Sequence, residues 1–376
     1  MKKSLLALLI STRMWGSFTS CIPVTFNNHP ASTLSNYTAM ICANGSTGGF
    51  CDSVAHTNLA VANFKGTGSG GDATSASGFD IIPHSNNNCS TRLSFELVAP
   101  TYVSATGAFE MHVLIPSLSS SVDTIIYMGV GDATITTDQS STAAWDSNFL
   151  LVSHYPNGSS LTVTDSTSNG NNGTITGGVT ASAGQIDGAA TFNGSTGYVT
   201  NGAVTVPVSS SLTASLWVFP TSFATVEVVL SNSVSTNDFL IYIDTNATIG
   251  CHIAPLNNTT ITSTTIPINT WSYLTCKSSV STGAPKIFIN GVEASYSQVG
   301  GTGATSGFTG LRVGAYADLS LKYTGRIDEP RFSLAYDSDA TILTTYNNQS
   351  APWNFYTFGS PIVISNSAPR RVISFQ

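Results

Sequence analysis

The residue types that could do chemistry in this chain are its few glutamates and histidines. Five glutamates stand at positions 96, 110, 227, 293 and 329. A glycoside hydrolase needs two carboxyl groups about 5–9.5 Å apart, one protonated and one ionised. A strand supplies them as Glu-x-Asp-x-x-Glu, and no such run is present, while the adjacent Asp328 and Glu329 should point to opposite faces. We therefore predict that the protein is not an enzyme.

Glu96 and Glu110 are the pair that a hairpin would bring together. Apolar residues alternate with polar ones over 92–97 and again over 109–113, and Thr106-Gly107 breaks the pattern between these runs. We interpret the face that carries both glutamates as a solvated polar face, with an acid/base pair as the alternative. The G-x-S-x-G and H-E-x-x-H motifs of hydrolases are absent from the sequence.

A metal is considered at residues 165–173, where Asp165, Asn169 and Asn171 place oxygen atoms at alternating positions around Gly170. This spacing is similar to the first half of a calcium loop, but the twelfth position holds Thr176 in place of glutamate. Calcium is therefore a candidate cofactor. The interpretation that we prefer is an Asx-turn loop that its own Asn and Ser side chains hold together.

Aromatic side chains are the candidates for a ligand surface. Single tryptophans near strand signals, such as Trp217 and Trp271, are expected in the core. Tyr242, Tyr316 and Tyr323 are expected at the surface, and we predict them as ligand-binding residues.

The first residues indicate export. Met1-Lys2-Lys3 and the apolar run 5–10 are typical of a secretory leader over 1–20, although Arg13 interrupts it. Six cysteines without a C-x-x-C pair favour disulfides over zinc. We predict Cys42 with Cys51, Cys251 with Cys276, and Cys21 with Cys89. The alternatives are a lipid anchor on Cys21 and, in a chain that is not exported, free buried thiols.

Composition excludes several classes of protein. Charged residues make up only 9% of the chain, the net charge is −7, and 41% is hydrophobic. No Lys or Arg occurs between Arg92 and Lys277, so a phosphate backbone would be repelled along half of the chain. Nucleic acid is thus excluded as a partner, and no apolar run is long enough to span a membrane.

Short apolar runs bounded by turn residues predict an all-β fold of two β-sandwich domains. Six strands are expected in an N-terminal domain at 21–149, and ten in a second domain at 150–359. Asn290-Gly291 is the strongest hairpin signal because both residues tolerate positive φ. No helix is predicted, and 360–376 is described as a tail of unknown role. The ten strands of the second domain are expected at 190–193, 213–219, 226–231, 239–244, 249–253, 271–276, 286–289, 311–316, 326–334 and 355–358.

Several segments together resemble known modules. The stretches 115–121, 124–128 and 144–148 are similar to the end of an uncharacterised β-rich domain that often precedes a lectin-like module in bacterial, archaeal and phage surface proteins. The second domain resembles the laminin G type of the concanavalin A-like lectin/glucanase superfamily, although residues 152–155 depart from the usual pattern. Its matching motifs are 165–173, 188–195, Trp271 with 288–292, and 325–333.

The resemblance implies a jelly-roll sandwich that binds glycans or mediates adhesion, in some relatives with calcium. Hydrolase members of the superfamily carry an acidic strand motif, which is missing from this sequence. We therefore predict an extracellular or cell-surface protein whose partner is a glycan or a surface protein. The first alternative is a structural, self-assembling protein of a phage particle or cell-surface assembly, and the second is a glycoside hydrolase.

Overall fold

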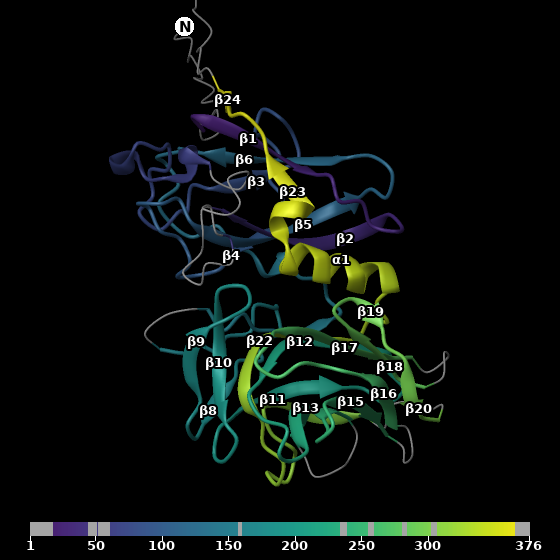
Figure 1. Cartoon of the computed structure of the whole chain (residues 1–376). Coiled ribbons are helices and arrows are strands. Elements are labelled where there is room, and N and C mark those ends of the chain that lie inside the picture. Colours follow the sequence, from purple (N-terminus) through teal and green to yellow (C-terminus); the bar gives the residue numbers. More distant parts are fainter. Residues whose placement is uncertain are drawn as a thin grey trace, which may run out of the picture.

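The computed structural model describes residues 18–43, 51, 61–156, 160–233, 239–254, 259–279, 284–301 and 307–364. Within these residues the chain forms antiparallel sheets almost throughout, which confirms the predicted all-β class. Figure 1 shows two bodies of sheet with a helix between them. We call the strands β1 to β6 the N-terminal region and the strands β7 to β22 the sandwich.

The N-terminal region contains the six strands that the sequence predicted. One described sheet has the order β23-β1-β6-β3, with β24 also paired to β1, and the other has the order β2-β5-β4. The hairpin expected around Thr106-Gly107 is present, since β4 and β5 pair antiparallel. The strands are β1 (Ser20–Phe26), β2 (Leu34–Ala43), β3 (Ile82–His84), β4 (Phe95–Leu97), β5 (Phe109–Leu118) and β6 (Thr124–Val130).

The sandwich consists, in its described residues, of two sheets of eight strands each. One has the order β19-β18-β17-β12-β22-β10-β9, with β7 also paired to β22. Its strands are β7 (Phe149–Val152), β9 (Thr180–Ala183), β10 (Gly188–Asn193), β12 (Leu212–Pro220), β17 (Ser272–Ser278), β18 (Lys286–Ile289), β19 (Val292–Glu293) and β22 (Thr324–Ser333). The other has the order β20-β16-β15-β14-β13-β21-β11-β8. Its strands are β8 (Thr174–Thr176), β11 (Tyr198–Val206), β13 (Glu227–Asn232), β14 (Phe239–Ile243), β15 (Thr248–Ile253), β16 (Thr259–Thr265), β20 (Tyr296–Gln298) and β21 (Phe308–Val313).

Strand β12 shows why the two bodies stay together. Leu216 and Val218 point into the core between the two sandwich sheets. Trp217, which alternation places on the opposite face, belongs to the core of the N-terminal region. The sheet is therefore buried on both faces, and nearly every residue of β12 is buried.

The turn at Asn290-Gly291 has the predicted conformation. Asn290 has φ 53° and Gly291 has φ 80°, and the strands on either side, β18 and β19, pair antiparallel. These two positive φ values are what a type I′ hairpin requires.

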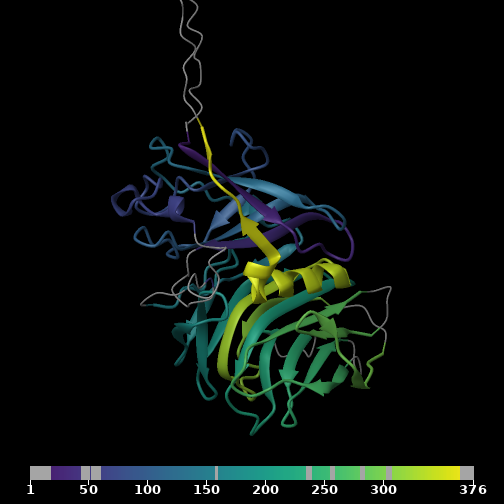
Figure 2. The ribbon, with the colours of Figure 1, turned by 45° about the horizontal axis from the view of Figure 1, so that its top comes forward.

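Helix α1 (Asp339–Ser350) lies between the two bodies and was not predicted (Figure 2). Ser338 begins it by accepting a hydrogen bond from the Thr341 N–H at 3.0 Å. The sequence LTTYNNQS carries no apolar stripe, and its buried polar side chains have partners on both bodies: Asn348 accepts from the Met40 N–H of β2, and Gln349 accepts from Trp217 Nε1 of β12. The other described helical elements are α2 (Pro352–Phe355) and the 3-10 turns η2 (Ala62–Phe64), η3 (Thr67–Ser69) and η4 (Thr142–Ala144).

After α2 the chain returns to the N-terminal region. Strand β23 (Tyr356–Phe358), which was expected to end the sandwich, pairs with β1 instead. Strand β24 (Ile362–Val363), in the expected tail, also pairs with β1. The assignment of 355–358 to the sandwich was wrong, because hydrophobic alternation does not specify the partner strand. The predicted domain boundaries otherwise stay a prediction.

The cysteines are joined in three disulfides among the described residues. Their Cα atoms are 5.9 Å apart for Cys21 and Cys89, 6.0 Å for Cys42 and Cys51, and 6.3 Å for Cys251 and Cys276. The last bond connects β15 with β17 and so joins the two sheets of the sandwich. A lipid thioether on Cys21 is incompatible with its bond to Cys89. The leader expected at 1–20 lies outside the described residues except for its last three.

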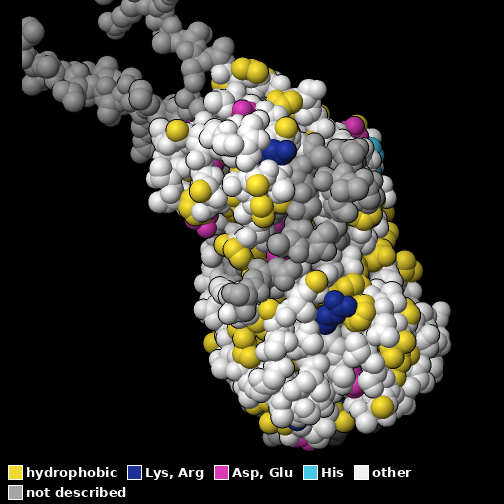
Figure 3. All heavy atoms as spheres, turned by 60° about the vertical axis from the view of Figure 1, so that its left-hand side comes forward, with side chains coloured by type: hydrophobic (Ala, Val, Ile, Leu, Met, Phe, Trp, Pro, Cys, Tyr) yellow, Lys and Arg dark blue, Asp and Glu magenta, His cyan; other side chains and the backbone are white. Residues whose placement is uncertain are grey.

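The face shown in Figure 3 carries few charged side chains, and hydrophobic side chains are spread over both bodies. No helix in the described part of the chain combines the length and the apolar character that a bilayer span requires.

Candidate functional site

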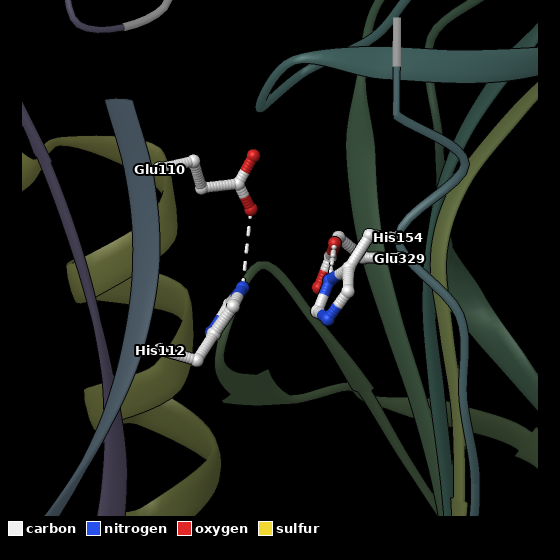
Figure 4. A group of neighbouring side chains, drawn as sticks. All are labelled: Glu110, His112, His154 and Glu329. Atoms are coloured by element: carbon white, nitrogen blue, oxygen red, sulfur yellow. Dashed lines mark hydrogen bonds and ion pairs between the residues drawn. The ribbon is translucent and has the colours of Figure 1, made fainter. Parts of the chain in front are cut away.

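The N-terminal region and the sandwich meet at a cluster of ionisable side chains. On β5, Glu110 and His112 are two residues apart and therefore share a face. Glu96 lies opposite His112 in the register between β4 and β5, so its side chain joins the same face. From the sandwich come Glu329 of β22 and His154, which follows β7 (Figure 4). Arg331 of β22 lies next to Glu329.

The expectation that this face of the hairpin is solvated was wrong. Glu110 is 1% exposed and His112 is 0% exposed, because the sandwich covers them. The opposite face of β5 carries Met111 and Val113, which are buried in the core of the N-terminal region. Alternation identified the two faces correctly but could not show that a second body of the chain covers the polar one.

His154 is the centre of the hydrogen bonds in the cluster. Its Nδ1 lies 2.5 Å from Glu329 Oε1, and its Nε2 lies 3.2 Å from Glu96 Oε2. Its ring stacks on that of His112, with centroids 4.4 Å apart. Glu96 also accepts hydrogen bonds from Trp145 Nε1 at 2.7 Å and Ser166 Oγ at 2.5 Å. All the ring nitrogens of His154 and both oxygens of Glu96 are thus engaged.

Glu329 binds Arg331 on its other side. Arg331 Nε donates to Glu329 Oε2 at 3.2 Å, and one terminal nitrogen of the guanidinium pairs with the same oxygen. Glu329 adopts φ 52°, where the pairing of β22 with β12 shifts register. Asp328 does not join this ion pair. Its carboxylate accepts hydrogen bonds from the N–H groups of Gln185 and Ile186, in line with the expectation that adjacent residues point to opposite faces.

Four of these groups stay charged although they are buried, because each lies next to a group of opposite charge. They are Glu96, His154, Glu329 and Arg331. Burial lowers the pKa of His154, but the carboxylates of Glu329 and Glu96 outweigh burial and raise it. Burial raises the pKa of Glu96, but the charge of His154 and its hydrogen bond hold that pKa at about 2. Burial likewise opposes ionisation of Glu329, yet His154 and Arg331 lower its pKa. Two positive and two negative charges therefore face one another.

Glu110 and His112 favour their neutral forms. Burial, followed by the neighbouring charge of Glu329, raises the pKa of Glu110. Burial, followed by the charge of His154, lowers the pKa of His112. His112 Nε2 lies 3.1 Å from Glu110 Oε1, while His112 Nδ1 is buried without a hydrogen-bond partner in the described structure.

A cavity of about 350 Å³ adjoins this cluster and is called the interface cavity here. It lies between β2, β22 and the start of α1, and its size falls within the range of small-ligand sites, about 300–1,000 Å³. Its lining is polar and aromatic and comprises 32–38, Trp145, Asp146, Phe149, Ser215, Tyr273, Arg331, Asp337, Ser338, Thr341 and Thr345.

Asp337 is an acidic lining residue whose pKa is shifted. Its backbone N–H donates to Thr213 at 3.1 Å and its carbonyl accepts from Lys277 Nζ at 2.7 Å, so these bonds fix the main chain. Burial, followed by the charge of Asp146, raises the pKa of its carboxyl group to about 6. Asp146 itself is committed to a turn, since its Oδ1 accepts from the Asn148 N–H at 2.8 Å.

The predicted tyrosines do not form one site. Tyr323 is 0% exposed, and its ring packs on Phe192, so the prediction that it lies at the surface was wrong. An aromatic residue followed by Thr-Gly gave no signal of this burial. Tyr242 and Tyr316 are half-buried, and neither lines the interface cavity. Their role in ligand binding stays a prediction.

The predicted calcium residues lie in a loop that bonds to itself. Asp165 Oδ1 accepts from the N–H groups of Val152 and Thr167, and Oδ2 accepts from the Asn171 N–H at 2.7 Å. The side-chain amides of Asn169 and Asn171 donate to the carbonyls of Phe149 and Leu150. This is the Asx-turn arrangement that the sequence analysis set against a calcium loop.

We expect Asp165→Asn to lower the free energy of unfolding by about 1–2 kcal/mol, because an amide nitrogen would replace one of the two acceptor oxygens. Thermal unfolding of the wild type and of Asp165→Asn, each with excess calcium and with chelator, measures this loss of stability. We expect the same loss in both solutions. A melting temperature of the wild type that rises with calcium and no longer does so in Asp165→Asn would favour the calcium loop instead.

Comparison with protein families gives one match in the sandwich. Residues 192–342 match the family described as the concanavalin A-like lectin/glucanases superfamily. These residues form a concanavalin A-like domain. The predicted second domain thus has the expected family, while the N-terminal region carries no family assignment. The superfamily includes both lectins and glucanases.

Solved structures of low identity are similar to part of the chain, whereas curated proteins give no match. Domain 4 of AbnA, an extracellular GH43 arabinanase from Geobacillus stearothermophilus in complex with arabinotriose, is 22% identical, with a TM-score of 0.39, over 53% of this chain and 98% of that one. The binding domain of botulinum neurotoxin serotype G is 15% identical, with a TM-score of 0.43, over 54% of this chain and 52% of that one. The SAP-like pentraxin from Limulus polyphemus is 17% identical, with a TM-score of 0.33, over 38% of this chain and 72% of that one.

Proposed function

We propose that the protein is an extracellular adhesion protein that binds a carbohydrate, or a surface ligand rich in hydroxyl groups, without transforming it. We place the ligand in the interface cavity. The concanavalin A-like domain and the disulfides support this function and this location. The observation that carries the proposal is Asp337, an acidic residue that lines the cavity and whose hydrogen bonds to Thr213 and Lys277 use only the main chain.

The cavity offers both kinds of partner that a sugar hydroxyl needs. The ionised carboxylate of Asp337 can accept hydrogen bonds from hydroxyl groups, and the hydroxyl of Thr345, which donates to the Thr341 carbonyl within α1, can still accept one. Tyr273 and Phe149 add apolar surface to the lining. The lining thus combines many polar groups with a few aromatic side chains, which suits a ligand rich in hydroxyl groups.

Two carboxyl groups in one cavity are also what a glycoside hydrolase uses. Asp146, however, already accepts the Asn148 N–H within its own turn, which is a structural role. We therefore favour binding over hydrolysis. Incubation with plant and bacterial polysaccharides, followed by an assay of reducing ends, should release no sugar, and measurable release that Asp337→Asn abolishes would replace the proposal with a hydrolase.

Asp337→Asn should weaken ligand binding about 10- to 100-fold, which corresponds to the loss of one charge-assisted hydrogen bond of about 1.5–3 kcal/mol. A glycan array identifies ligands of the wild type, and calorimetry then compares the variants. Asp318→Asn is the matched control because Asp318 is exposed and bonds only within its own turn, to Ser320. An unchanged affinity in Asp337→Asn would place the ligand elsewhere.

The same variant tests the pH dependence. Because the pKa of Asp337 is raised to about 6, the carboxylate loses its charge as the pH falls through 6, and wild-type affinity should fall with it. Asp337→Asn should show no such dependence. A raised carboxyl pKa also means that this group contributes stability below its unfolded pKa and loses it as the pH rises through about 6. The neutral amide should therefore not destabilise the protein at pH 7.5, so lost binding cannot be ascribed to unfolding.

A further inference from the structure

The cluster at the interface contains a set of metal-ligand atoms separate from the interface cavity. Glu110, His112, His154 and Glu329 each offer one ligand atom, and these four atoms all lie within 4.8 Å of one another. All four side chains are buried. Figure 4 shows Glu110 and His112 on one strand facing His154 and Glu329 from the sandwich.

The charges of the cluster match a divalent cation. When ionised, the carboxylates of Glu96, Glu110 and Glu329 carry three negative charges, and Arg331 supplies one positive charge. With both histidines neutral, as metal ligands must be, two negative charges remain. A divalent ion balances these two charges by displacing the protons that Glu110 and His154 carry without it.

The surroundings of His154 are those of a metal-bound histidine. Its Nδ1 lies 2.5 Å from Glu329 Oε1, another member of the set, while its Nε2 lies 3.2 Å from Glu96 Oε2. A carboxylate at the second ring nitrogen fixes the tautomer and the ring orientation of metal-ligating histidines. Glu96 is in turn held by Trp145 and Ser166.

His112 provides a separate indication. Its Nδ1 is buried and unpartnered in the described structure, although buried polar atoms are rarely left so. Protein hydrogen bonding alone therefore does not satisfy this ring, whose Nε2 lies at the cluster. Coordination at Nε2 would not give Nδ1 a partner, so the position of Nε2, 3.1 Å from Glu110 Oε1 and on the ring that stacks on His154, is what supports a ligand role for His112.

We propose that Glu110, His112, His154 and Glu329 bind one divalent transition-metal ion, with zinc as the best match, and that this ion joins the N-terminal region to the sandwich. Two imidazoles and two carboxylates form a ligand set that zinc accepts in tetrahedral sites. At bond lengths of about 2.0–2.1 Å, tetrahedral ligand atoms lie about 3.3 Å apart. The four atoms thus have to close by at most about 1.5 Å, which side-chain torsions can supply.

The test uses the full chain, stripped of metal with a chelator and then titrated with Zn²⁺ by calorimetry. We expect one Zn²⁺ per chain, and a melting temperature that rises with Zn²⁺. Co²⁺ in its place should give the intense visible absorption of a tetrahedral site with nitrogen ligands. Absence of stoichiometric binding, or Co²⁺ bound only with the weak spectrum of an octahedral surface site, would overturn the proposal.

Variants locate the ion. His112→Gln and Glu110→Gln should each weaken Zn²⁺ binding at least 100-fold, and Glu96→Gln about 10- to 100-fold, since Glu96 only orients His154. His252→Gln is the matched control because His252 lies on β15, remote from the cluster, and should bind as the wild type does. Equal Zn²⁺ affinity in His112→Gln and the wild type would overturn the assignment. If a variant does not fold, the Co²⁺ spectrum of the wild type decides.

Discussion

Arg331→Met should lower the free energy of unfolding by about 3–5 kcal/mol, the loss expected when one partner of a buried ion pair is removed. Glu329 is 1% exposed and would keep its charge without its guanidinium partner. The methionine side chain preserves most of the apolar stem of arginine, so the loss would reflect charge and hydrogen bonding more than packing.

Denaturant unfolding at pH 7 measures this loss. Arg92→Met is the matched control because Arg92 is exposed and bonds to Gln139 at the surface, so its removal should cost less than about 0.5 kcal/mol. The double variant Arg331→Met with Glu329→Gln should recover part of the stability, because no unpaired charge is then buried. A loss below about 1 kcal/mol in Arg331→Met would mean that water reaches Glu329 and that the interface is open in solution.

Much of the fold could be predicted because apolar alternation and turn residues are local signals. The six strands of the N-terminal region, the hairpin at Asn290-Gly291 and the three cysteine pairs were all read from such signals. Strands rich in Thr and Ser, such as β16 and β9, were missed because their polar side chains do not alternate with apolar ones.

The candidate site could not be predicted because it depends on which surfaces meet. The pairs Glu110/His112 and Glu329/Arg331 each have the two-residue spacing of a shared strand face, which was a usable signal for a polar face. Nothing local indicates that the two faces cover each other. Asp337 gave no signal either, since its raised pKa arises from burial against another part of the chain.

Asn348→Leu should lower the free energy of unfolding by about 2–4 kcal/mol, because it leaves two buried main-chain groups without partners. Strand β2 is at the edge of its described sheet, so the outward N–H and C=O groups of Met40 have no strand partner. Asn348 of α1 takes that place: its Oδ1 accepts from the Met40 N–H at 2.7 Å, and its Nδ2 donates to the Met40 carbonyl at 2.9 Å. Leucine has nearly the same shape but can form neither bond.

The same edge continues two residues further along β2, where the hydroxyl of Tyr356 accepts from the Cys42 N–H at 2.7 Å. The returning C-terminal segment therefore closes an edge that would otherwise be open to other strands. Asn347→Ala is the matched control, since Asn347 is half-buried on the same helix and should cost far less. Denaturant unfolding measures stability, and limited proteolysis should show faster cleavage of Asn348→Leu than of Asn347→Ala. If the two variants unfold and cleave alike, the side chain of Asn348 does not hold α1 against β2, and burial of Trp217 beside the helix must carry the contact between the two bodies.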